Sequence, residues 1–124
     1  RELLRDRDAM VQKYMPAVED EGEKAIVWID GEFTHAVRKS PRFADGLEQV
    51  SVALTISPDE RAVAEQAMAH VREKILYGRV DVVKGAGGKI VVSEFELIEP
   101  SLFLMQHPPA LEKLVAGIKI ILGV

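Results

Sequence analysis

The stretch from Gly78 to Ile98, GRVDVVKGAGGKIVVSEFELI, decides the fold, because it places two apolar runs on either side of a glycine-rich turn. This pattern predicts a β-hairpin. If Gly87-Gly88 are the two turn residues, Asp81 faces Glu94 across the two strands. Side chains alternate along a strand, so Glu96 lies on the same face as Glu94. The stretch therefore predicts three carboxylates on one small face of a sheet.

Such a group of acids needs a physical reason, because like charges that face each other destabilise a sheet. A bound divalent cation is one reason, since Mg²⁺ takes oxygen ligands, usually one or two carboxylates together with substrate phosphates. We therefore predict Asp81, Glu94 and Glu96 as metal ligands. We also expect that, without metal, removing one of these charges leaves the fold intact or stabilises it. The alternative is a polar face exposed to solvent.

The metal hypothesis depends on the register of this hairpin. A four-residue loop over residues 85–88 would pair Lys84 with Lys89 and leave Asp81 diagonal to Glu94, still on the same face. A slip of one residue would instead put Asp81 and the two glutamates on opposite faces of the sheet.

Composition limits the class of protein. The chain has 124 residues, of which 48% are apolar and 29% charged, as is typical of one soluble globular domain. The net charge of −4 disfavours non-specific binding to nucleic acid. The lack of cysteine excludes disulfides and thiolate metal sites. No apolar run reaches the roughly 18–20 residues of a membrane span, and no signal peptide is evident, so we expect a cytoplasmic protein with no membrane partner.

The remaining pattern predicts an α+β domain with a mainly antiparallel sheet. Ser57, Pro58 and Glu60 mark the start of a long helix, whose apolar residues recur every four positions as far as Ile75. A last helix, C-terminal to Pro108-Pro109, is strongly apolar. Strands are predicted at residues 9–14, 23–29 and 32–39, with a hairpin turn at residues 30–31, and a short strand is compatible with residues 50–55.

Several of these features, in their order, resemble the C-terminal half of an ATP-grasp domain. The superfamily includes D-alanine–D-alanine ligase, glutathione synthetase and the ribosomal-protein glutamate ligase. The resemblance covers about residues 9 to 104. Its motifs are the Arg-x-Asp strand at Arg79 and Asp81, Glu94 as the first glutamate of the metal motif, a hinge strand at Met10–Met15, and the segments DGEFTHAVRK (30–39) and ELIEPS (96–101). The last two resemble a branch close to the ribosomal-protein glutamate ligase.

The resemblance implies an ATP-dependent carboxylate–amine or carboxylate–thiol ligase that acts through an acyl phosphate. ATP and Mg²⁺ would be its cofactors, and a nucleotide with small carboxylate and amine substrates its partners. Asp81, Glu94 and Glu96 would hold Mg²⁺, although the family usually has Asn where this chain has Glu96. Arg79 would stabilise the transferring phosphoryl group or the tetrahedral intermediate, and Arg38 would contact a phosphate or the substrate carboxylate.

The same resemblance implies that the segment before the first hairpin binds the nucleotide base and ribose. Gln12, Lys13, Tyr14 and Met15 would contact adenine, and Glu19 the ribose. Alternatives without a ligand remain: an ion pair for Arg79, a solvated acidic turn for Glu19, core packing for Tyr14 and Met15, and a charged strand end for Lys39 and Arg42.

The family's phosphate-clamping lysines, glycine-rich lid loop and N-terminal substrate domain precede the hinge strand. We therefore expect residues 1–124 to be a single domain, the C-terminal subdomain of a longer enzyme, inactive and weak in nucleotide binding when isolated. Two alternatives stay open: a non-catalytic fragment that serves as a binding or assembly module, and an unrelated α+β domain with a simple cation site. Apolar surface left uncovered would also be compatible with a homo-oligomer.

Overall fold

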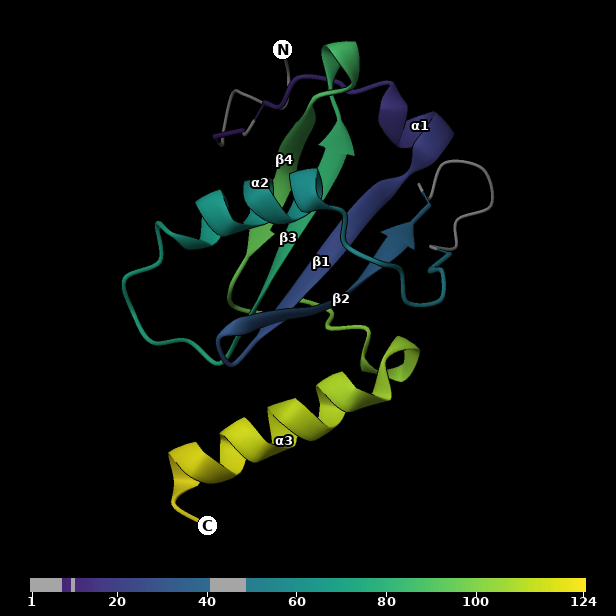
Figure 1. Ribbon diagram of the computed structural model, residues 1–124. Helices are drawn as coiled ribbons and strands as arrows, with labels where there is room; N and C mark the ends of the chain where they lie inside the picture. Colours follow the sequence, from purple (N-terminus) through teal and green to yellow (C-terminus); the bar gives the residue numbers. More distant parts are fainter. Residues whose placement is uncertain (1–7, 10, 41–48) are drawn as a thin grey trace.

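In the part of the chain that the structure describes, the fold is a four-stranded antiparallel sheet with three α-helices (Figure 1). The computed structural model describes residues 8–9, 11–40 and 49–124. The strands are β1 (Glu23–Ile29), β2 (Glu32–Lys39), β3 (Tyr77–Lys84) and β4 (Ile90–Glu96), in the spatial order β2-β1-β3-β4. The predicted α+β class with a mainly antiparallel sheet is confirmed.

The β1–β2 hairpin turns at Asp30-Gly31, as predicted, with positive φ angles of 43° and 91°. Positive φ at both central residues is what a type I′ hairpin turn requires. The hairpin is not regular, because Val27 pairs with His35 whereas the next residue of β1, Trp28, pairs with Phe33. The residue between them, Thr34, is therefore a β-bulge, which changes the face on which the rest of β2 presents its side chains.

A second bulge lies in the β3–β4 hairpin. Its loop contains a short 3₁₀ turn, η1 (Ala86–Gly88), and Lys84 pairs with Ile90, so the register predicted at the turn is wrong by one residue. Continued regularly, this register would put Asp81 opposite Ser93. The bulge at Ser93 restores the predicted pair, and Asp81 lies opposite Glu94.

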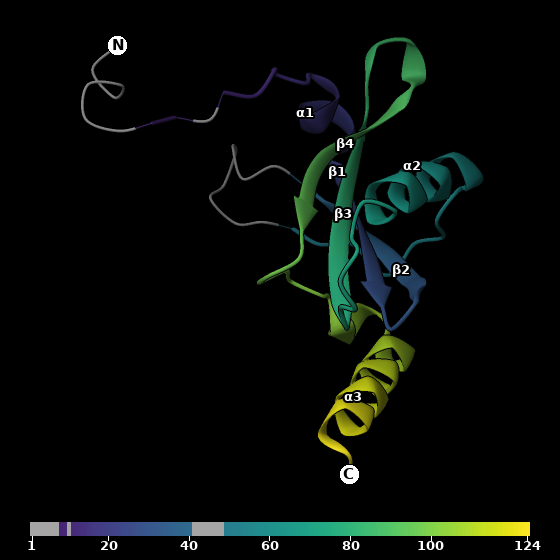
Figure 2. The ribbon, with the colours of Figure 1, turned by 90° about the vertical axis from the view of Figure 1, so that its left-hand side faces the viewer.

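Helix α2 (Pro58–Met68) covers one face of the sheet (Figure 2). It begins at the predicted capping box of Ser57 and Glu60. The core between α2 and the sheet contains Ile26, Ala36, Ala64, Val80 and Val82. The helix is shorter than predicted: the segment after Met68 returns to β3, and Ile75 and Leu76 lie next to Gly117 of the last helix instead of extending α2.

The opposite face is only partly covered. A 3₁₀ turn, η2 (Leu104–Gln106), and helix α3 (Pro108–Leu122) lie at one end of the sheet, where Val27, Ile29 and Ala110 form a second core. The predicted C-terminal helix is confirmed, but it projects away from the sheet instead of lying buried in it (Figures 1 and 2).

Other predicted elements differ. Residues 11–15 have no strand pairing, because they run beside β4 instead of joining the sheet, and residue 10 lies outside the described residues. Between residue 15 and β1 lies a short acidic helix, α1 (Ala17–Glu21). The segment 50–55 contributes only two isolated bridges to β2, and Arg42 lies outside the described residues. Within the described ranges, none of the helices has the length and apolarity needed to cross a membrane.

Candidate functional site

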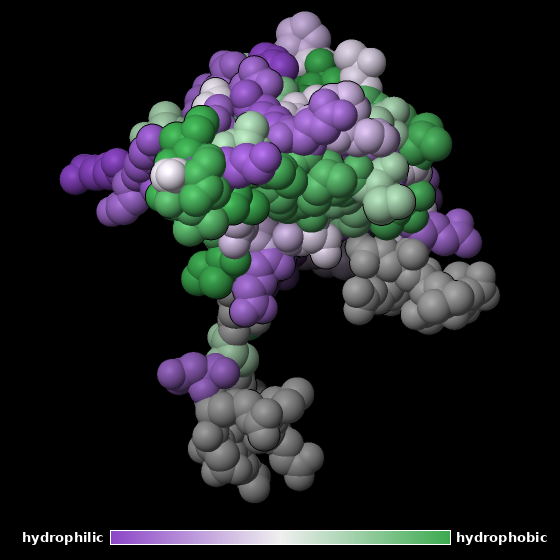
Figure 3. All heavy atoms as spheres, turned by 90° about the horizontal axis from the view of Figure 1, so that it is seen from below, coloured by the Kyte–Doolittle hydropathy of each residue, from purple (hydrophilic) through white to green (hydrophobic). Residues whose placement is uncertain are grey.

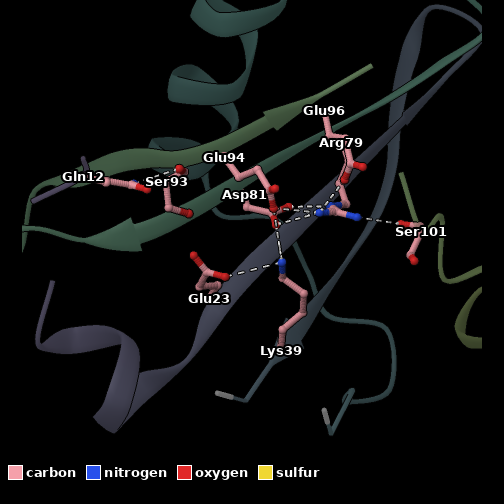
Figure 4. Close-up of polar contacts among 9 residues, drawn as sticks. All are labelled: Gln12, Glu23, Lys39, Arg79, Asp81, Ser93, Glu94, Glu96 and Ser101. Carbon is pink, nitrogen blue, oxygen red and sulfur yellow. Dashed lines mark hydrogen bonds and ion pairs between the residues drawn. The ribbon is translucent and has the colours of Figure 1, made fainter. Parts of the chain in front are cut away.

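A group of charged side chains lies on the sheet face opposite α2 (Figure 4). All four strands contribute to it. We call it the charged cluster, and its members are Glu23 of β1, Lys39 of β2, Arg79 and Asp81 of β3, and Glu94 and Glu96 of β4. Each of the four acids forms an ion pair with Lys39, with Arg79 or with both. The sheet thus brings together charges that are far apart in the sequence.

Arg79 is at the centre of the charged cluster. Its Nε and Nη2 atoms donate to the two oxygens of Asp81 at 2.8 and 3.1 Å. Nη2 also lies 2.9 Å from a carboxylate oxygen of Glu94 and 2.8 Å from one of Glu96. The guanidinium carbon is 5.9 Å from the ring centre of Phe103, at the edge of cation–π range. Arg79 is thus held in one orientation from several sides.

Asp81 is fully buried and accepts hydrogen bonds from both cations of the charged cluster, Arg79 and Lys39. Burial lowers the pKa of Lys39, but the hydrogen bond and the charge of Asp81 outweigh it and raise that pKa above its ordinary value. Removing Asp81 would therefore leave two buried cations without the buried carboxylate that they share, which is costly. These contacts favour a structural role for Asp81, whereas the sequence-based expectation is that losing this charge leaves the fold intact or stabilises it.

Glu94 and Glu96 are more accessible, with 51% and 31% of their side chains exposed. No group of three or more acidic or histidine side chains, among the residues that the structure describes, is close enough to hold a metal ion. The three predicted metal ligands instead converge on Arg79. Four carboxylates surround two cations in the charged cluster, so it carries an excess of negative charge on oxygen atoms, the type of ligand that Mg²⁺ prefers. Glu94 and Glu96 are the more accessible of the three predicted ligands, and Asp81 is fully buried.

Arg38 does not join the charged cluster. It pairs with Lys24 across β1 and β2, and it lines a cavity of about 220 Å³ together with Lys24, Glu60 and Lys84. A regular hairpin would have put Arg38 on the side of Asp81. The bulge at Thr34 exchanges the two faces, so that Lys39 makes the contact instead.

The predicted hinge segment lines a cavity beside the charged cluster. The cavity has a volume of about 250 Å³, and its lining residues are Gln12, Lys13, Tyr14, Met15, Val18, Glu23 and Ser93. The side-chain amide of Gln12 donates to the backbone oxygen of Ser93, which connects the segment to the bulge of β4 (Figure 4). Glu23 belongs to both the cavity lining and the charged cluster.

Glu19 lies close to this cavity through its contact with Tyr14. A hydrogen bond with Glu19 is the main cause that raises the pKa of Tyr14, followed by burial and by the charges of Glu19 and Asp20. The predicted adenine-binding residues and the predicted ribose-binding residue thus lie in one neighbourhood, and their roles in nucleotide binding stay predictions.

Sequence reasoning missed three participants. The sequence indicates only a charged strand end at Lys39, because the bulge at Thr34, which turns Lys39 toward Asp81, gives no strong sequence signal. Glu23 was one of several acids near the hinge segment, and only the register of β1 with β2 selects it. Ser93 is the bulged residue of β4 and lines the cavity of the hinge segment. Its buried Oγ has no hydrogen-bond partner among the described residues.

Comparisons with known proteins agree with this fold. No protein-family model matches the chain. It is 34% identical to the cycloserine biosynthesis protein DcsG of Streptomyces lavendulae over 114 residues, which cover 82% of this chain and 38% of that protein. The crystal structure of D-cycloserine synthetase DcsG matches it with a TM-score of 0.72 and 32% identity, over 86% of this chain and 40% of that one.

A weaker match is the ATP-grasp ligase PsnB in complex with the precursor peptide PsnA2 and AMPPNP. Its TM-score is 0.47 at 21% identity, over 78% of this chain and 32% of PsnB. The chain thus spans about two fifths of the length of the cycloserine synthetase. In sequence and in fold it is similar to that part of D-cycloserine synthetase DcsG, and the order of its motifs resembles that of the ATP-grasp superfamily.

Proposed function

We propose that residues 1–124 form a single domain, the C-terminal subdomain of an ATP-dependent carboxylate–amine or carboxylate–thiol ligase. The observation that carries this proposal is the charged cluster, with its excess of carboxylates around Arg79, beside a cavity lined by the hinge segment. An ATP-binding site needs both parts: a place for the base, and charges that hold the phosphates and their metal ion.

The cavity beside the hinge segment would take the adenosine part of ATP. Met15 and Val18 give it apolar walls, and the backbone of Lys13 and Met15 offers hydrogen-bonding groups to the edge of adenine. Tyr14 would flank the adenine, and Glu19 would lie toward the ribose. Glu23 joins this cavity to the charged cluster, so a nucleotide in the cavity would direct its phosphates toward Arg79.

Glu94, Glu96 and Asp81 would be the residues that hold Mg²⁺ on those phosphates. When bound, the ion neutralises phosphate charge and aligns the transferring group. Glu94 and Glu96 offer partly exposed carboxylates for this role. Asp81 would act first as the buried acceptor that fixes the guanidinium of Arg79 and the ammonium of Lys39.

Arg79 would supply fixed positive charge for the reaction. Phosphoryl transfer depends on positioning and on stabilising charge that develops in the transition state, more than on a protein nucleophile. A guanidinium already held by Asp81 needs little reorganisation to donate to an oxygen of the transferring group. Such a site would convert a carboxylate into an acyl phosphate, which an amine or thiol then attacks.

The substrates would be small molecules. The synthetase to which this chain is similar is named for D-cycloserine, a small product, which supports a small carboxylate and a small amine here. Arg38 would contact a phosphate or a substrate carboxylate only from the α2 side, where it lines its own cavity with Lys24 and Lys84.

Titration of the 124-residue chain with ADP, with and without Mg²⁺, tests the proposal by calorimetry. We expect weak binding that Mg²⁺ strengthens, and we expect the double variant Glu94→Gln/Glu96→Gln to lose the effect of Mg²⁺. The matched control is Glu65→Gln, which removes an exposed carboxylate of α2 far from the charged cluster and should change nothing.

The position of the nucleotide has a separate readout. Backbone amide signals of residues 11–15 should shift in NMR spectra when ADP is added. Binding that ignores Mg²⁺ in the unchanged chain, or shifts confined to the α2 face, would contradict the proposed site.

A further inference from the structure

Helix α3 exposes an unusual amount of apolar surface. Its exposed apolar side chains, with exposures between 41% and 72%, are Leu111, Val115, Ile118, Ile120, Ile121 and Leu122. Figure 3 views the molecule from the side on which α3 lies, and apolar side chains form a continuous band across this face. A helix at a protein surface normally directs polar residues to solvent, so a band of this kind indicates a contact surface.

Four of these residues have the spacing of a coiled coil. Leu111, Val115, Ile118 and Leu122 follow one another at intervals of four, three and four residues, the alternation of the apolar positions of a heptad. We call these four residues the α3 seam. An average period of 3.5 to 3.7 residues keeps them on one stripe of the helix. A stripe of this kind fits another helix of similar length.

The α3 seam does not face the body of its own chain. The residues of α3 that pack toward the sheet are Ala110 and Leu114 in the second core, and Gly117 next to Leu76. The α3 seam runs beside these contacts, and α3 projects beyond the sheet (Figures 1 and 2). The α3 seam is therefore accessible to a second helix while α3 keeps its contacts with its own body.

We propose that the occupant is α3 of a second copy of this chain, paired in antiparallel orientation. With Val115 opposite Ile118 of the partner subunit, Leu111 falls opposite Leu122 of the partner subunit, and a two-fold axis generates both contacts twice. The same patch on both subunits is then complementary to itself, as a closed dimer requires.

Charge complementarity selects this orientation. Glu112 and Lys119 lie on the same flank of the α3 seam, seven residues apart, which is roughly 10 Å along a helix and too far for an ion pair within one chain. In the antiparallel pair, Glu112 comes close to Lys119 of the partner subunit, and the symmetry makes this contact twice. In a parallel pair, Glu112 and Lys119 would each lie against the other flank of the partner helix. That flank is apolar, with Leu114 and Ile121, so neither charge would be neutralised.

Sedimentation of the 124-residue chain tests the dimer directly. We expect a concentration-dependent dimer, and Ile118→Glu should weaken it at least about tenfold, because a charge would be buried in the α3 seam. The control is Ile120→Glu, which adds the same charge on the same helix outside the α3 seam and should leave the dimer intact. A monomeric chain would overturn the proposal, and so would equal effects of the two variants.

Disulfide cross-linking tests the orientation of the two helices. The chain has no native cysteine, so only the introduced thiols can react. A mixture of Leu111→Cys and Leu122→Cys chains should form the mixed disulfide under mild oxidation, because those positions face each other in the antiparallel pair. Leu111→Cys alone should not cross-link to itself. A disulfide between two Leu111→Cys chains would show a parallel pair and overturn the proposal.

Charge reversal provides an independent check on the flank. Glu112→Lys or Lys119→Glu alone should weaken the dimer by a few fold, because each brings like charges together, and the double reversal should restore its affinity. Failure of the double reversal to restore affinity would contradict the antiparallel ion pairs.

Discussion

The two faces of the sheet use charge differently. On the α2 face, the Glu60 carboxylate accepts from the backbone of Ser57 at 2.8 Å and lies 2.7 Å from Nζ of Lys24. Glu60 and Lys24 are thus both engaged in structural contacts. On the opposite face, the charged cluster gathers four carboxylates around Lys39 and Arg79, more than the fold needs to neutralise two cations.

Within the charged cluster itself, burial distinguishes an acid that stabilises the fold from acids that are accessible to a ligand. Asp81 has no exposure and bonds to both cations, whereas half of the Glu94 side chain is exposed at the rim. Removing one partner of a buried ion pair is costly, because the other charge is left unpaired, whereas removing one partner of a solvent-screened pair costs little. The buried acid should therefore act on stability, and the rim acids should be free to act on a ligand.

The largest expected effect is that of Asp81→Asn. The variant keeps the size of the side chain but removes the one fully buried carboxylate that contacts both Arg79 and Lys39, and leaves these cations only the more exposed acids of the charged cluster. Breaking a buried pair in this way costs about 3 kcal/mol. Urea unfolding of the metal-free chain should show this loss as a lower midpoint.

The matched variant is Glu94→Gln, which removes one charge of the same cluster at the rim. It should change the free energy of unfolding by no more than about 0.5 kcal/mol, because solvent already screens this pair. Equal losses in the two variants would show that burial does not divide the charged cluster as we describe.

A smaller effect is expected on the α2 face from Ser57→Ala. The Ser57 hydroxyl accepts from the backbone N–H of Glu60, and the Glu60 carboxylate accepts from the backbone N–H of Ser57. Loss of an N-cap costs about 1 kcal/mol. Urea unfolding should show this loss, Ser57→Thr should largely retain stability, and calorimetric binding of ADP should stay unchanged because the cap lies on the other face.

Two β-bulges explain most of the differences between the sequence-based site and the structure. The bulge at Thr34 moves Arg38 to the α2 face and brings Lys39 to Asp81. The bulge at Ser93 compensates for a longer turn and returns Glu94 to its place opposite Asp81. Patterns of alternation assume a regular ladder, and a single extra residue reverses every face beyond it. The residue types of the site were therefore predictable, but not which neighbouring basic residue reaches it.

Strong local signals, by contrast, located most of the fold. Asp30-Gly31 fixed the first hairpin, and the Ser57 capping box fixed the start of α2. The end of α2 was not predictable, because Ile75 fits the helical period but packs next to α3 instead. The segment 11–15 is apolar enough for a strand, yet it borders a cavity beside β4. Tertiary contacts decide such cases, and they are not local properties of the sequence.

The last prediction concerns a neutral group on the face of the charged cluster. His35 is 3% exposed, and its ring stacks on that of His107, with centres 5.0 Å apart. Burial, and then the charge of His107, lower the pKa of His35 below its ordinary 6.5. In the folded chain His35 thus resists a proton that the unfolded chain accepts.

The sign of the pH dependence follows from this lowered pKa. Above pH 6.5 both states are neutral at His35 and its contribution to stability is complete; it is lost as the pH falls below 6.5 toward the folded pKa. The urea concentration at the midpoint of unfolding should therefore decrease as the pH is lowered from 7.5 to 5.5. Most carboxylates stay ionised over this range, so their titration contributes little. NMR titration of the ring should give a pKa below 6.5 for His35. His107→Gln should raise that pKa only partly, because burial is the larger cause, and a full return to 6.5 would show instead that the neighbouring charge dominates.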